Sequence, residues 1–237
     1  MPVPLVTAAS AVLLGIGVGW HHTAVALITT ALILVLSLSS TSVSQLAPLA
    51  LVPLTAWWGI PWPLPALAAV AAAVALGWRP VGWWYRGNQM TALTASATLT
   101  LGCSISWWLT QSQMAAHPLL LHTSRPPGSV ILAAVVGAAA GNSVAEEVLW
   151  RGLVLDRMLA ARFTTSWVVA LQASAFGLSH YGGAPSGWPG VIAAAIFSGA
   201  LTILRLKIGL VPVTLVHLCV DTAIFVTAAQ NMIYIDR

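Results

Sequence analysis

Residues 129–151 have the sequence SVILAAVVGAAAGNSVAEEVLWR, an apolar run that ends in Glu146, Glu147 and Arg151. About 20 apolar residues in a helix are enough to cross the ~30 Å hydrocarbon core of a bilayer. A charged side chain at the centre of such a span costs about 2.5–3.5 kcal/mol, and it usually faces the interior of the bundle. The stretch therefore predicts a transmembrane helix whose charged end has a function.

The whole chain has the composition of a membrane protein. Of its 237 residues, 59% are hydrophobic and only 6% are charged, whereas soluble domains carry roughly 25% charged residues. This composition excludes a soluble globule, and the scarcity of polar residues excludes a disordered chain. The 9 Lys and Arg residues are scattered singly or in pairs, which excludes a nucleic-acid partner. We expect an integral membrane protein surrounded by the lipid bilayer.

Apolar runs elsewhere predict an all-α fold, a polytopic transmembrane helical bundle of about eight or nine spans. The candidate spans are residues 4–20, 23–39, 46–60, 63–78, 90–110, 129–150, 165–181, 189–204 and 209–229. Prolines interrupt residues 46–78, so the third and fourth runs could be a broken pair instead of two full crossings. We divide the chain into N-terminal helices of unassigned role (1–110), a polar loop (111–128) and a core (129–230).

Basic residues between the spans predict the orientation of the bundle. Three loops, each two spans from the next, carry pairs of cations: Arg79 and Arg86, Arg157 and Arg162, and Arg205 and Lys207. Alternating spans place these loops on one side, which the positive-inside rule assigns to the cytoplasm. Nine spans then put the N-terminus inside. The chain has no organelle signal, so we expect a prokaryotic cytoplasmic membrane.

Several ionisable residues of the core are four positions apart, and residues at this spacing share one face of a helix. Glu147 and Arg151 are four apart and are expected to form an ion pair. His217 and Asp221 have the same spacing on the last span. Glu146 is rotated by about 100° from Glu147 and is free to face a different partner. The carboxyl, imidazole and guanidinium groups of three helices could therefore converge.

Three motifs occur in order along the core: EExxxR at 146–151, FxxxH at 176–180 and HxxxD at 217–221. Together they resemble the CPBP family of intramembrane proteases, the CAAX protease and bacteriocin-processing family, which includes the type II CAAX prenyl endopeptidases. The resemblance covers about residues 129–230. It identifies residues 129–230 as the catalytic core, whereas residues 1–110 show nothing diagnostic.

The resemblance implies that Glu146 and His180 activate a water molecule, with Glu146 as the general base. Arg151 would pair with Glu147 and fix its orientation. The residues themselves favour water as the nucleophile, because the chain has no GxSG, HExxH or GxGD motif. Counting 1.5 Å per residue from the loops places His180 deeper in the membrane than Glu146, although a helix tilt or a re-entrant end after residues 181–183 could bring the two level.

His217 and Asp221 would lie near the oxyanion of the reaction. Many members of the family have Asn where this chain has Asp221, and an ionised Asp cannot donate a hydrogen bond to an oxyanion. Asp221 is therefore either protonated or serves only to orient His217. We expect Phe176 and Trp150 to line a substrate pocket.

No cofactor is expected. The alternative is a single Zn²⁺ held by Glu146, His180 and His217, with water as the fourth ligand. The histidines lack the short ligand spacing of the usual zinc proteases.

The sequence thus predicts an intramembrane endopeptidase, a hydrolase whose site opens to the cytoplasm and whose partner is a membrane-associated peptide or protein. CAAX-type protein processing and bacteriocin or peptide maturation are both open as its task. Two alternatives remain. One is a non-catalytic membrane immunity or scaffold protein. The other is a proton-coupled transporter, although the inverted repeats of transporters are absent from the sequence.

Overall fold

The structure is a computed structural model that describes residues 49, 51–52, 64–82, 94, 97–98, 101–102, 128–181 and 187–235. The predicted spans 4–20 and 23–39, and residues 111–127 of the predicted polar loop, lie outside the described residues. So does most of the spans predicted at 46–60 and 90–110.

Helices make up the regular structure of the described ranges, which contain no strand. In chain order they are α4 (Leu64–Ala75), α6 (Gly128–Glu147), the π-helix η3 (Val148–Val154), α7 (Leu155–Ala160), α8 (Thr165–Ser179), α9 (Gly187–Ile208) and α10 (Leu210–Ile235). The all-α prediction is confirmed for this part of the chain. Gly187–Ile208 and Leu210–Thr227 are long and apolar enough to cross a membrane. The count of eight or nine spans stays a prediction.

The helix that begins at Gly128 continues beyond the end of the predicted span of residues 129–150. It widens into η3 and continues as α7 to Ala160. The charges do not end the helix because Glu147 and Arg151 are paired inside the bundle. They therefore lie well inside a long continuous helix.

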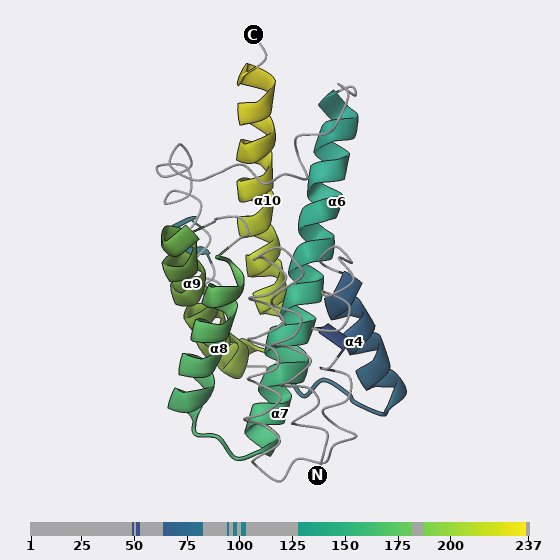
Figure 1. The fold of residues 1–237 in the computed structure, drawn as a ribbon, viewed down its shortest axis with the longest axis vertical. Coiled ribbons are helices and arrows are strands. Elements are labelled where there is room, and N and C mark those ends of the chain that lie inside the picture. Colours follow the sequence, from purple (N-terminus) through teal and green to yellow (C-terminus); the bar gives the residue numbers. More distant parts are fainter. Residues whose placement is uncertain are drawn as a thin grey trace, which may run out of the picture.

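Two helix pairs frame the core. α6 packs along α10, and α8 packs along α9. Figure 1 shows that α6 and α10 extend well beyond the ends of α8 and α9 on the side of the C-terminus. The end of α8 therefore lies beside the middle of α6 and α10, and this geometry positions the site described below.

Gly177 sets the distance between α8 and α9. A Cβ atom at this position would lie 2.7 Å from both the Ala195 Cβ and the Val191 carbonyl oxygen. Neither atom can move without the helix that carries it. Gly199 lies on the same interface, but a Cβ there would come no closer than 3.7 Å to its nearest neighbour.

A Gly177→Ala substitution is therefore expected to destabilise the protein by about 1–3 kcal/mol, the usual effect of overpacking a core. Gly199→Ala is the matched control, and it should be neutral or stabilise by up to about 1 kcal/mol through helix propensity. Thermal unfolding of both variants in detergent measures the difference. Equal unfolding midpoints for the two variants would show that α8 and α9 are not in close contact at Gly177.

A polar network joins three segments at the end of the bundle near α7. The Asp156 carboxylate lies 3.6 Å from the Arg205 guanidinium and accepts hydrogen bonds from the Val81 N–H (3.1 Å) and the Trp78 indole (3.3 Å). Arg205 also donates to the Val81 carbonyl. The three segments meet at one end, as the alternation of spans predicts. The cytoplasmic assignment of this end stays a prediction.

Arg205 lies in a different place from the one that the sequence predicts. We expected it in a loop, but it lies in the last turn of α9 and is buried. Its Nε donates to the carbonyl oxygen of Arg151 at 3.0 Å. Arg205 is therefore a structural residue that connects α9 to η3 as well as to Asp156.

Asp156 lies beyond the predicted span and gives the protein a pH-dependent stability. Burial raises the pKa of Asp156 above its usual range, although the Val81 N–H and Arg205 oppose the shift. The folded state therefore holds this proton more tightly than the unfolded state. The stability that this bound proton contributes is fully present at pH values below the pKa of Asp156 in the unfolded state. It is lost as the pH rises through the pKa of Asp156 in the folded state.

We expect the unfolding midpoint of the wild type, relative to that of Asp156→Asn, to fall as the pH rises above about 4, the ordinary pKa of an aspartate. The Asn side chain cannot lose a proton, so the stability of the variant lacks this dependence on pH. Thermal unfolding of the two proteins across a series of pH values is the measurement. A difference that stays constant or grows with pH contradicts the expectation.

Candidate active site

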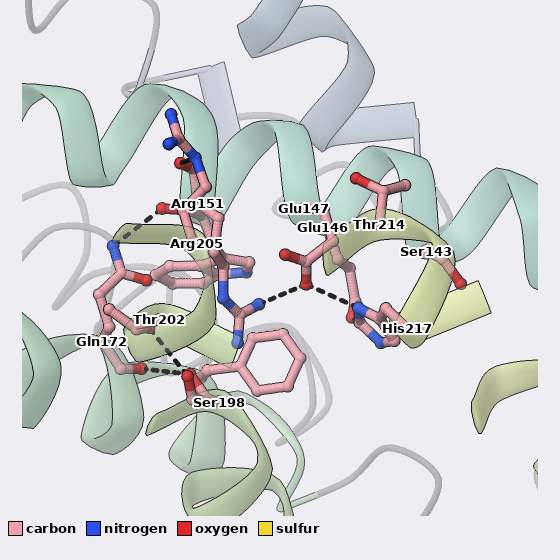
Figure 2. Close-up of polar contacts among 12 residues, drawn as sticks. Ser143, Glu146, Glu147, Arg151, Gln172, Ser198, Thr202, Arg205, Thr214 and His217 are labelled. Carbon is pink, nitrogen blue, oxygen red and sulfur yellow. Dashed lines mark hydrogen bonds and ion pairs between the residues drawn. The ribbon is translucent and has the colours of Figure 1, made fainter. Parts of the chain in front are cut away.

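Glu147 lies at the centre of a buried polar cluster between η3 and α10. Its Oε1 accepts a hydrogen bond from the Arg151 guanidinium at 2.8 Å and another from the His217 Nδ1 at 2.7 Å (Figure 2). The side chains of Glu147 and Arg151 are both 0% exposed. The predicted ion pair is confirmed, and it extends to the imidazole of a second helix.

Glu146 faces the other nitrogen of the same ring. Its Oε2 lies 3.6 Å from His217 Nε2, and Asp221 Oδ1 lies 3.3 Å from that nitrogen. Glu146 therefore faces a partner other than Arg151, as expected, and it shares that partner with Glu147. The reason is that α10 packs along α6, so the His217 ring is reached by both carboxylates. Glu146 Oε2 is buried, and no described residue forms a hydrogen bond to it.

Asp221 is held by two residues that the sequence did not point to. Its Oδ2 accepts a hydrogen bond from the Asn142 amide at 3.0 Å and lies 2.8 Å from Ser143 Oγ. These residues precede Glu146 and Glu147 by four positions each, so they share a helix face with them. Their polarity within an apolar run was the signal that could have found them.

Phe176 is the packing centre of the site. Its ring lies 4.5 Å from the Arg151 Cζ, a cation–π contact, and its centroid lies 4.5 Å from that of His180 and 6.0 Å from that of His217. Trp150 meets the same ring edge-on at 6.2 Å. Phe176 and Trp150 are both buried. Their part in a substrate pocket stays a prediction.

His180 lies at the end of α8, with its Nδ1 2.9 Å from the carbonyl oxygen of Phe176. The depth of His180 in the membrane relative to Glu146 stays a prediction. With only 15 residues, α8 ends beside the cluster, and the Phe176 ring bridges His180 to His217 and Arg151. The described contacts connect His180 to the cluster through Phe176, without a direct bond to Glu146.

All six predicted polar site residues therefore lie in or against one cluster formed by α6, η3, α8 and α10. Residues 128–223 match the model of the family described as Rce1-like, type II CAAX prenyl endopeptidase Rce1-like. This part of the chain is similar to the Rce1-like family. No curated protein and no solved structure matched the chain.

The match supports the CAAX protease family inferred from the three motifs, and it contains all of them. It also supports a peptidase in the membrane, since the Rce1-like family is one of integral membrane proteins and two helices of this chain are long enough to span a bilayer. The match spans residues 128–223, and the predicted division of the chain into domains stays a prediction. The earlier helices lie outside the match.

Side chains of the neighbouring helices hold the π-helix of the Rce1-like domain in place. The Gln172 amide donates to the Trp150 carbonyl at 2.8 Å, and Arg205 donates to the Arg151 carbonyl at 3.0 Å. Short π-helical segments leave the regular bonding pattern and are frequent at functional sites. The wider turn carries Arg151 under Phe176, so Gln172 and Arg205 indirectly fix the guanidinium. Neither residue was predicted.

The zinc alternative, with Glu146, His180 and His217 as ligands, stays a prediction. Nowhere in the described ranges do three His, Cys, Asp or Glu side chains form a group that could hold a metal ion. Both nitrogens of His217 face carboxylates, and Nδ1 is committed to Glu147 at 2.7 Å. His180 turns its Nδ1 to a backbone carbonyl.

Proposed function

We propose that this protein is an intramembrane endopeptidase that hydrolyses a peptide bond of a membrane-associated peptide or protein with water activated by Glu146. The proposal rests on one observation within a domain of a protease family. Among the three carboxylates around His217, Glu146 is the one that accepts no hydrogen bond from the described residues.

The other two carboxylates are engaged as acceptors. Glu147 Oε1 accepts from Arg151 and His217, and Asp221 Oδ2 accepts from Asn142. A carboxylate that already accepts hydrogen bonds from protein donors is a poor base for water. The side chain of Glu146 is also 8% exposed, whereas that of Glu147 is 0% exposed. Glu146 therefore lies, with Asp221 (10% exposed), at the more accessible edge of the cluster.

The reaction follows from this arrangement. Glu146 removes a proton from water as the oxygen attacks the carbonyl carbon of the substrate, which forms the C–O bond and a tetrahedral oxyanion. The C–N bond then breaks, and Glu146 returns the proton to the leaving amine. We propose that His180 orients the same water from the end of α8. Glu147, Arg151 and Asp221 position His217.

The substrate class and the setting are further parts of the proposal. The family resemblance suggests two classes of substrate. One is prenylated CAAX proteins, and the other is bacteriocins and other peptides that mature at the membrane. We propose a prokaryotic cytoplasmic membrane with the N-terminus inside and the site open to the cytoplasm. We propose a metal-free mechanism, and cleavage should continue in the presence of EDTA.

Comparative mass spectrometry of membrane peptides tests the function. Membranes that contain the wild type should yield cleavage products that are absent when Glu146→Gln is expressed at the same level. The Glu146→Gln protein serves as the matched control because it keeps the shape of the side chain. If the folded wild type yields no product that depends on Glu146, the proposal is wrong.

A further inference from the structure

Hydrolysis of a peptide bond needs a hydrogen-bond donor for the oxyanion as well as a base for the water. Within the described cluster most donors are unsuitable. Asp221 accepts a hydrogen bond from the Asn142 amide and lies against His217, so it is an acceptor and not a donor. The two nitrogens of His217 face carboxylates. Arg151 is 0% exposed and covered by Phe176, out of reach of a substrate.

Asn142 is the exception. One N–H of its side-chain amide donates to Asp221 Oδ2 at 3.0 Å, which fixes the amide. An amide has two such N–H groups, and the second has no partner among the described residues. Asn142 is half-buried, so a substrate can reach it.

The position along the helix fits an oxyanion donor. Asn142 precedes Glu146 by four residues on α6, so their Cβ atoms are about 5–6 Å apart on one face. A water bound to Glu146 attacks a carbonyl carbon from about 3 Å. Asp221 connects the two groups: its Oδ2 bonds the Asn142 amide at 3.0 Å, and its Oδ1 and the Glu146 Oε2 lie 3.3 Å and 3.6 Å from the same nitrogen of His217. The amide therefore lies on the side of the cluster where a carbonyl attacked beside Glu146 would place its oxygen.

We infer that Asn142 is a catalytic residue, which donates its second N–H to the oxyanion while Asp221 holds the amide in place. This inference rests on the proposed function. Asp221 then orients the Asn142 amide on α6 as well as His217.

The test compares Asn142→Ala with Ser143→Ala, measured on the products that depend on Glu146. Ser143 contacts the same Asp221 oxygen at 2.8 Å and is fully buried, so its variant reports the loss of support for Asp221 without the loss of a substrate contact. Asn142→Ala should lower kcat about 100- to 1,000-fold with little change in KM. Ser143→Ala should lower kcat less than about 10-fold.

Similar losses in the two variants would show that Asn142 only supports Asp221 and would overturn the inference. So would an Asn142→Ala protein with wild-type kcat. Asn142→Leu keeps the branching and the number of heavy atoms of the side chain and removes both N–H groups, so it replaces Asn142→Ala if that variant unfolds. The absence of any product that depends on Glu146 would overturn the proposed function and this inference with it.

Discussion

Replacing Arg151 with Met is expected to destabilise the protein by about 3–5 kcal/mol. Arg151 and Glu147 are both 0% exposed and paired at 2.8 Å. Removing one partner of a buried ion pair leaves the other charge without compensation, and this causes most of the loss. Denaturant or thermal unfolding in detergent measures the effect. Cleavage should be lost as well, because Glu147 also holds His217.

Two further variants isolate the buried charge as the cause. Lys207→Met removes an exposed cation from the end of α9 and should change stability by less than about 0.5 kcal/mol. The double variant Glu147→Gln with Arg151→Met should recover much of the lost stability without recovering cleavage. If Arg151→Met unfolds at the same midpoint as Lys207→Met, the buried pair does not form.

Replacing Glu146 with Gln is expected to lower the rate of cleavage about 100- to 10,000-fold, the usual contribution of a general base. Stability should not fall, because Glu146 accepts no hydrogen bond from the described residues and its amide replacement has the same shape. Initial rates and unfolding midpoints, measured on one preparation, give both quantities.

Glu147→Gln is the matched comparison, since it changes the neighbouring residue in the same way. It should lose stability as well as cleavage, because its Oε1 binds both Arg151 and His217. A Glu146→Gln protein that cleaves at the wild-type rate contradicts the assignment of the base. A Glu146→Gln protein that unfolds as readily as Glu147→Gln would show that both carboxylates are structural.

The sequence was sufficient for the parts of the site that obey helical spacing. Glu147 and Arg151 meet because residues four apart share a face, and His217 approaches Asp221 for the same reason. The family motifs added the order of the helices. Charges buried in an apolar run were the strongest signal, because side chains that cost so much to insert into a membrane are rare and mostly functional.

What the sequence missed depends on how the helices pack. The pairing of both glutamates with His217 requires the register of α6 against α10, which no spacing within one helix reveals. The position of His180 beside the cluster depends on where α8 ends. Arg205 was placed in a loop because a charge at the end of a span usually marks one, whereas here Asp156 and a backbone carbonyl compensate it inside the bundle.

Glu146 is proposed to act through water and not to attack the substrate itself, and the whole mechanism depends on this role. A single turnover in H₂¹⁸O, with enzyme in excess over a substrate identified by mass spectrometry, tests this directly. Water attack predicts one ¹⁸O atom in the new carboxyl group of the product from the first turnover. An unlabelled carboxyl group, with the label later found on Glu146, would show a covalent intermediate on that residue and contradict the proposed mechanism.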